Sequence, residues 1–160
     1  MSGYLLAKDA PNGKQGTAFI TLHKDTGDEI HELFSAKKVN MKVDYQKTDF
    51  KVIGTTTIQK KTTGASKTGT MTIYQGTPLF IEMAREYESK GKVLYFDLQV
   101  INSDPSTSIG TQKIAYYGCS LDSIPLSILD ADADFLEQEV GLSYTSFEVL
   151  ESYNDPATLG

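Results

Sequence analysis

Hydrophobic side chains occupy every second position over much of this chain, and this pattern predicts β-strands. Between residues 39 and 45 the alternation is strict, as in a strand with one buried and one solvated face. Elsewhere the pattern is supported by enrichment in β-branched and aromatic residues. Together these features predict seven or eight strands, at 17–23, 29–35, 39–45, 50–60, 70–75, 92–101, 112–121 and 139–152.

One segment, residues 78–90, has helical spacing instead. Thr77 is a suitable N-cap residue, Pro78 fits the first helical position, and Gly91 is the expected C-terminal stop. The apolar residues of this segment recur at three- and four-residue intervals and form one stripe. They are Leu79, Phe80, Met83, Ala84 and Tyr87.

These elements predict a mainly β fold, either a β-sandwich or a small β-barrel with one flanking helix. We expect an N-terminal arm at residues 1–16, a single β domain at 17–153 and a frayed tail at 154–160. The segment 61–69 is rich in Gly, Ser, Thr and Lys, so it is expected to be a loop.

Composition limits the class of protein. With 39% hydrophobic residues, the 160-residue chain can bury a core and is too apolar to be disordered throughout. Its single cysteine, Cys119, allows no internal disulfide, which fits a reducing compartment. The first residues lack the pattern of a signal peptide, and no apolar run is long enough to span a bilayer. We therefore expect synthesis in a cytoplasm and no membrane partner.

Charge is distributed very unevenly along the chain. Residues 37–68 contain eight lysines against two aspartates, whereas no basic residue follows Lys113 and nine acidic residues do. The net charge is −6. A monomer could offset this segregation by folding one segment onto the other, and an assembly could set one copy's basic segment against the next copy's acidic surface. The second option predicts a self-assembling structural subunit.

Two short motifs resemble ligand-binding sites, but each lacks residues that the site requires. Gly64 and Gly69 have the spacing of a P-loop, but Thr70 stands where the phosphate-binding lysine is required. Asp130, Asp132 and Asp134 resemble half of an EF-hand loop that lacks the later Gly and Glu. The first motif is expected to be a turn. The second leaves open a weak cation site beside a solvated or partner-facing acidic surface.

Catalytic and metal-binding residues are scarce. His23, His31 and Cys119 are the soft or borderline ligands, and their spacing matches no zinc motif. Cys119 lies in an expected strand, where a cysteine is most often a small buried hydrophobe. We therefore expect no catalytic residue, no metal site and no cofactor, and we expect that the protein is not an enzyme.

The lysine-rich segment leaves one alternative open. Lysines interleaved with Tyr45 and Phe50 suit phosphates and bases, so 37–68 could bind nucleic acid on a small β-barrel. However, the segment contains no arginine, and the net negative charge opposes nucleic-acid affinity overall. Specific nucleic-acid binding is therefore not expected.

The order of these segments resembles the tail tube (core tail) proteins of contractile phage tails, particularly those of PBSX-type defective prophages and phage-tail-like bacteriocins. The resemblance covers roughly residues 35–152, and the first 34 residues match least. It is carried by the helix expected at 78–90 and by five further segments. They are 60–74 (KKTTGASKTGTMTIY), 90–100 (KGKVLYFDLQV), 110–113 (GTQK), 117–123 (YGCSLDS) and 130–151 (DADADFLEQEVGLSYTSFEVLE).

The resemblance implies a structural subunit of a phage or phage-tail-like particle. Six copies would form a ring, and rings would stack into a hollow inner tube inside a contractile sheath, a conduit for DNA, ions or protein. The implied partners are further copies of the chain, the sheath protein, and the baseplate or initiator and tape-measure proteins. The implied location is the tail tube of a virion or tail-like particle.

Within that family we expect contacts between copies in two places. The strand pair 39–45 and 50–60 would join the inter-subunit sheet, with its connection at 46–49 reaching the adjacent ring, and the loop 62–68 would make a second contact. The candidate interface combines this basic segment with the acidic one. Its residues are Lys42, Tyr45, Lys47, Phe50, Lys51, Lys60, Lys61, Thr62, Gly64, Lys67, Asp130, Asp132, Asp134, Glu137 and Glu139.

Overall fold

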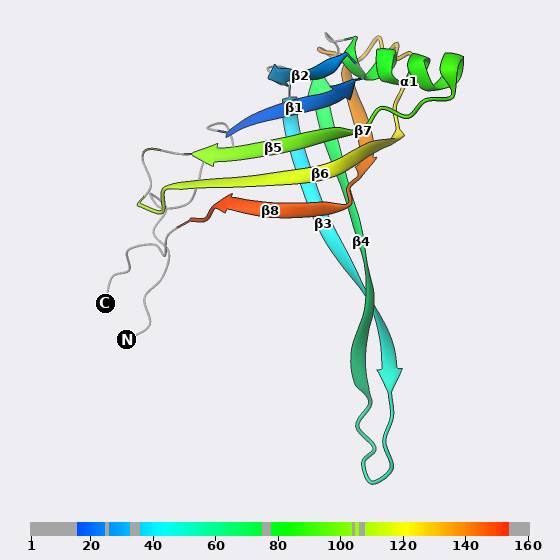
Figure 1. Cartoon of the computed structure of the whole chain (residues 1–160), viewed down its shortest axis with the longest axis vertical. Coiled ribbons are helices and arrows are strands. Elements are labelled where there is room, and N and C mark those ends of the chain that lie inside the picture. The colour runs from blue at the N-terminus through cyan, green and yellow to red at the C-terminus, as the bar shows by residue number, and fades with distance from the viewer. Residues whose placement is uncertain are drawn as a thin grey trace.

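Eight strands and one helix make up the described part of the chain (Figure 1). The computed structural model describes residues 16–24, 26–32, 36–74, 78–103, 105 and 108–153. Apart from Gly16, the arm predicted at 1–16 lies outside these residues, as does the tail predicted at 154–160. The elements are β1 (Gly16–Lys24), β2 (Gly27–Glu32), β3 (Ala36–Phe50), β4 (Gln59–Tyr74), α1 (Leu79–Lys90), β5 (Phe96–Ser103), β6 (Thr111–Ser123), β7 (Glu137–Ser143) and β8 (Ser146–Glu151).

All strand pairs are antiparallel, and β6 joins the two halves of the sheet. The strand order is β2-β1-β5-β6-β7-β4-β3, with β8 also paired to β6. The first half of β6 pairs with β5 and β8, whereas its last residues pair with β7. A strand that changes partners along its length makes a corner between two packed layers. The expected mainly β fold with one helix is thus confirmed for the described residues.

Gly118 forms this corner. Its φ of +66° lies in the left-handed region, and an added Cβ would collide with Thr145, so glycine is required twice over. The Gly118 amide donates to the Asp97 carboxylate at 3.4 Å, and the Thr145 amide donates to the Tyr117 carbonyl at 2.9 Å. These bonds satisfy backbone and side-chain groups where the regular ladder is interrupted.

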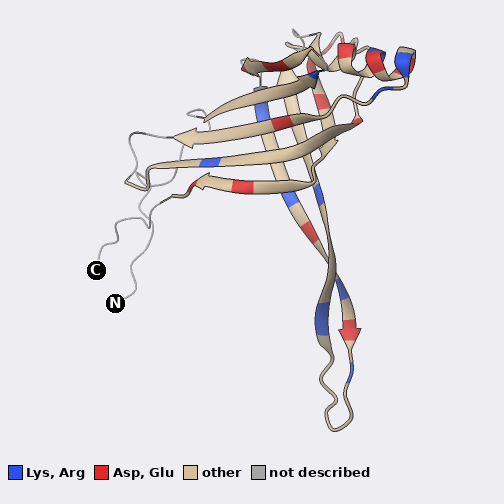
Figure 2. Ribbon diagram, viewed as in Figure 1, with Lys and Arg blue, Asp and Glu red and all other residues tan. Residues whose placement is uncertain are grey.

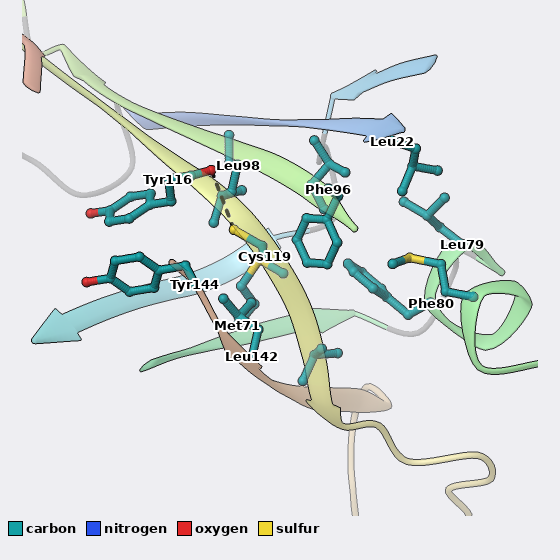
Figure 3. Close-up of a cluster of buried hydrophobic side chains, with 14 of the residues drawn as sticks. Leu22, Met71, Leu79, Phe80, Phe96, Leu98, Tyr116, Cys119, Leu142 and Tyr144 are labelled. Atoms are coloured by element: carbon teal, nitrogen blue, oxygen red, sulfur yellow. Dashed lines mark hydrogen bonds between the residues drawn. The ribbon is translucent and has the colours of Figure 1, made fainter. Parts of the chain in front are cut away.

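The core lies between the two halves of the sheet and is covered at one end by α1 (Figures 1 and 3). The fully buried side chains come from five strands and the helix, which is why no pair of these elements can be stable alone. The apolar ones are Ile20, Leu22, Met71, Ile73, Phe80, Phe96, Leu98, Cys119, Val140 and Leu142.

Two tyrosines close the other end of the core. The rings of Tyr116 and Tyr144 pack edge to face, with centroids 5.0 Å apart. The Tyr144 hydroxyl donates to the Lys42 carbonyl at 2.9 Å, which fastens β3 to the body of the protein (Figure 3 shows both rings).

The helix begins one residue later than expected. Pro78 is the N-cap and not the first helical residue, and it makes no side-chain cap bond because proline has no donor or acceptor there. Thr77, the expected cap, lies outside the described residues. Gly91 ends the helix with φ +65°, as predicted, and its amide donates to the Tyr87 carbonyl at 2.7 Å. No helix in the described ranges is long and apolar enough to cross a membrane.

In the lysine-rich segment 37–68, the structure has a connection where a strand was predicted and a strand where a loop was predicted. The predicted strand at 50–60 is wrong, because β3 ends at Phe50 and residues 51–58 form the connection, with Gly54 at φ +103°. The predicted loop at 61–69 is also wrong, because these residues belong to β4 and pair with β3. Backbone pairing needs no particular side chain, and a small residue fits here: a Cβ at Gly69 would collide with the Met41 side chain.

Other strands differ from expectation mainly at their ends. The strand expected at 92–101 begins at Phe96, and the segment 139–152 is two strands, β7 and β8. Residues 33–35, expected at the end of the second strand, lie outside the described residues. Such shifts arise because the ends of strands depend on partner strands, which periodicity does not identify.

Phe80 tests how far the helix supports the core. Phe80→Ala should lower the free energy of unfolding by about 3–5 kcal/mol, because the fully buried ring leaves a cavity. Tyr87→Ala, on the exposed side of the same helix, should cost less than about 1 kcal/mol. Denaturant unfolding at a concentration where the protein is monomeric measures both. Equal losses would contradict the packing described here.

Candidate assembly surfaces

The hairpin of β3 and β4 extends far beyond the body of the protein (Figure 1). The last pair that joins β4 to β7 is Thr68 with Ser143, and the Tyr144 amide donates to the Lys67 carbonyl at 3.2 Å. Residues 44–66, here called the outer hairpin, pair only with each other within the described part of the chain. At the rise of a β-strand, this ribbon projects by about 25 Å.

The outer hairpin is exposed on both faces. A two-stranded ribbon without further packing is marginally stable in water. Its connection, residues 51–58, is here called the hairpin tip, and it carries three exposed aliphatic side chains. Val52 is 41% exposed, Ile58 is 52% exposed, and Ile53 is fully exposed. An apolar tip on a solvated ribbon is typical of a surface that a partner covers.

Ten of the fifteen candidate interface residues lie on the β3–β4 hairpin, eight of them within the outer hairpin. The ten are Lys42, Tyr45, Lys47, Phe50, Lys51, Lys60, Lys61, Thr62, Gly64 and Lys67. The connection expected at 46–49 and the contact loop expected at 62–68 are instead strand residues of β3 and β4. Both corrections keep the residues on the protruding element, because the two strands that carry them are paired.

Few of these lysines are neutralised within the subunit. Lys60 pairs with Asp49 at 2.7 Å, Lys42 pairs with Asp44 at 3.2 Å, and Lys67 donates to the Thr145 carbonyl at 3.0 Å. In the part of the chain that the structure describes, no ion pair joins Lys47 or Lys61. The hairpin therefore presents net positive charge to solvent (Figure 2).

The five acidic candidates lie elsewhere. Asp130, Asp132 and Asp134 are in the connection between β6 and β7, and Glu137 and Glu139 are on β7. This connection lies near α1, at the end of the molecule opposite the hairpin tip (Figure 1). Within the described residues, the structure thus pairs no basic candidate with an acidic one in the same subunit, although the basic and acidic segments adjoin at the base of β3. There Lys37 donates to Glu137 at 2.7 Å, and this bond raises the pKa of Lys37.

Sequence reasoning missed two apolar surfaces. Val52, Ile53 and Ile58 were assigned to a strand interior, although Gly54 among β-branched residues was a turn signal. The second surface is β8, whose six residues are all exposed, including Phe147 and Val149. β8 pairs with β6 on one side only, so its other edge is free in the described residues.

The side chains that suggested metal or catalytic chemistry are not arranged for it. No three His, Cys, Asp or Glu residues converge as ligands within the described ranges, the three alternating aspartates included. Gly64 and Gly69 lie in a β-strand, so they form no phosphate-binding loop. Burial raises the pKa of the Cys119 thiol to about 12, and its Sγ lies 3.5 Å from the Tyr116 carbonyl. A thiol that stays protonated is a poor nucleophile.

His23 lies in a compact charge cluster on the other half of the sheet. Its Nδ1 lies 3.0 Å from Asp28 on β2, and its Nε2 lies 2.9 Å from Asp97 on β5. The hydrogen bond to Asp28, with that to Asp97, raises the pKa of His23 above 6.5. The ring thereby links three neighbouring strands at the edge of the sheet.

The chain is similar in sequence to known proteins over almost its whole length. The family model for phage tail tube proteins matches residues 3–151. The chain belongs to the phage tail tube protein family. The match also covers residues 3–34, which lie outside the range over which the sequence resemblance was stated. A curated member, the phage-like element PBSX protein XkdM of Bacillus subtilis (strain 168), is 32% identical over 151 residues, or 94% of this chain and 97% of XkdM.

Solved structures show the same fold at low sequence identity. A chain of the anti-feeding prophage baseplate, a 6-fold symmetrised structure, is 8% identical with a TM-score of 0.64, covering 94% of this chain and 97% of that one. A chain of the sheath–tube complex of an extracellular contractile injection system is 13% identical with a TM-score of 0.60, covering 84% and 88%. At this level of identity, these likenesses show the fold alone.

The His23 cluster gives a pH-dependent term in stability. Because the folded pKa is raised above the unfolded value, this stabilisation is fully present below about pH 6.5 and is lost as pH rises through the folded pKa. His23→Gln should therefore destabilise the monomer at about pH 5.5 and make little difference at about pH 8.5. The effect should be under about 1 kcal/mol, since both ion pairs are solvated.

Unfolding free energies of the two proteins at both pH values measure this difference. Asp28→Asn supplies the control, because it removes one carboxylate and should remove part of the same pH dependence. An equal loss at both pH values for His23→Gln would show that the ring acts by packing and not by charge.

Proposed function

We propose that this protein is the subunit of a tail tube, in which six copies form a ring and rings stack into the inner tube within a contractile sheath. The proposal starts from membership of the phage tail tube family. It is supported by the fold shared with chains from a 6-fold symmetrised baseplate and from a sheath–tube complex. The conduit would pass DNA, ions or protein.

The outer hairpin is the observation that carries the proposal. About twenty residues of exposed ribbon gain no stabilisation from the body of their own subunit, and the hairpin tip exposes three aliphatic side chains. In an isolated subunit, such a ribbon contributes little to stability. In a stack, the same ribbon would pack on a neighbouring copy and bury its apolar tip.

Open strand edges suit the formation of rings. β2 and β3 are the outer strands of the path through the sheet, and β8 has a free edge. Exposed edges pair readily with strands of other chains. Different edges on one molecule permit a heterologous contact, which closes into a ring if the rotation between copies allows it. This interface would include β3 over residues 39–45, where the sequence placed it.

Charge would contribute to the contact between copies. Lys47 and Lys61 on the hairpin, together with Asp130, Asp132 and Asp134 at the other end, would meet across a subunit boundary. Opposite charges steer association and fix the register of an interface. The same separation of charge within one copy would be costly in a permanently monomeric protein.

The remaining assignments follow from the same role. The protein would act structurally and not as an enzyme, with residues 17–153 as the tube domain. The sheath protein would contact the outside of the ring, and baseplate or initiator and tape-measure proteins would define the ends and length of the tube. The tube would be assembled in the host cytoplasm and would be part of the virion or tail-like particle.

Electron microscopy of the purified protein over a concentration series, paired with light scattering, tests the proposal. Rings or tubes of uniform bore are the expected result, because the interfaces needed are all carried by one chain. The result that would overturn it is a monomer at every concentration, also with sheath and baseplate proteins added. If that monomer bound single- or double-stranded DNA with a steep salt dependence, the lysine-rich segment would instead be a nucleic-acid surface.

Reversing hairpin charges tests the electrostatic part separately. Lys47→Glu/Lys61→Glu should raise the protein concentration needed for assembly about tenfold, because losing two exposed contacts costs about 1–2 kcal/mol. Lys47→Gln/Lys61→Gln should have an intermediate effect, and high salt should reduce the difference between the variants. Light scattering at low and high ionic strength measures all three proteins. Unchanged assembly of the Glu variant would mean that apolar strand pairing dominates.

A further inference from the structure

A groove lies between α1 and the end of β6, at the opposite end of the molecule from the hairpin tip (Figure 1). Its volume is about 480 Å³. Met83, Ala84 and Tyr87 of the helix form one wall, and Leu121, Ile124 and Leu126 form the other. Tyr87 and Leu126 are more than half exposed, so this apolar surface is open to solvent.

Charge in the groove is of one sign. Glu88 and Asp122 line it, and no lysine, arginine or histidine does. Asp122 accepts the Ser143 hydroxyl at 2.6–2.7 Å, which holds its carboxylate in place. The groove therefore combines an apolar lining with negative charge, and it suits a partner that carries apolar side chains flanked by basic ones.

The hairpin tip has this composition. Val52, Ile53 and Ile58 are its exposed aliphatic residues, and Lys47, Lys51, Lys60 and Lys61 flank them against Asp49 alone. The hollow on the other side of α1 is a poorer match. Four basic residues line it, Lys24, Arg85, Lys90 and Lys92, against two acidic ones, Glu82 and Glu86, so its net positive charge would repel the flanking lysines. Of these two surfaces beside the helix, the groove between α1 and β6 has the charge that suits the hairpin tip.

We propose that this groove is the receptor for the hairpin tip of a second copy, with Ile53 seated between Ala84 and Leu126. The inference rests on the proposed tube function and specifies which surfaces meet between stacked copies. Within one copy the tip points away from α1, so it cannot reach its own groove (Figure 1). A tip at one end and its receptor at the other define a head-to-tail contact, which repeats along an axis without closing.

Cysteine cross-linking between two single-site variants tests the contact. Ile53→Cys is mixed with Ala84→Cys, or with Leu126→Cys, assembled, and oxidised mildly. Ile53 is fully exposed and Leu126 is 66% exposed, so neither substitution disturbs the core. Ser89→Cys, on the same helix but outside the groove, is the matched control, and the buried native Cys119 serves as the internal background.

The expected result is a disulfide-linked dimer in both groove mixtures, and its absence with Ser89→Cys and in each variant alone. Tubes that form normally but give no Ile53–Ala84 or Ile53–Leu126 link would overturn the docking site and leave the tube function standing. Equal linking to Ser89 would also overturn it, since the tip would then be unseated. Absence of any ordered assembly in the unsubstituted protein would overturn both proposals together.

Discussion

β6 is the element on which the rest of the structure depends, because it belongs to both halves of the sheet. Its first residues hydrogen-bond to β5 and β8, and its last residues hydrogen-bond to β7. The change of partner at Gly118 folds the sheet over the core, so the buried side chains of β1 and β5 meet those of β4 and β7. Without that corner, the apolar faces of the two halves would have no common partner except solvent.

The same core anchors the outer hairpin, which does not itself pack against it. β3 and β4 enter the body beside β7, where Tyr144 bonds to the Lys42 carbonyl, and then leave it as a free ribbon. The extension, with its exposed apolar tip, offers a surface for binding but contributes little to the stability of the subunit itself. Stability of the subunit and formation of the assembly can therefore be changed by different residues.

Charge follows this division between body and extension. Lysines are concentrated on the hairpin, while the described acidic residues that follow β6 lie at the helix end, on β7 and on β8. Lys37 and Glu137 meet at the base of the hairpin, where the segments adjoin in one copy. Farther out, distance separates the hairpin lysines from the acidic residues beyond β6 in the same copy, since screening limits such contacts to about 10 Å. The remaining complementarity is available only between copies, and it favours a head-to-tail arrangement.

Sequence by itself determined the mainly β class, the single helix ending at Gly91, the buried state of Cys119 and the separation of charge. Each of these follows from local periodicity, local turn chemistry or composition. It also placed the candidate interface on the basic segment. Only the tertiary structure decided that residues 61–69 form a strand and 51–58 the turn, because cross-strand pairing overrides side-chain propensity there. Likewise, the groove between α1 and β6 joins residues about forty positions apart, and no local pattern signals which distant surfaces the corner at Gly118 will bring together.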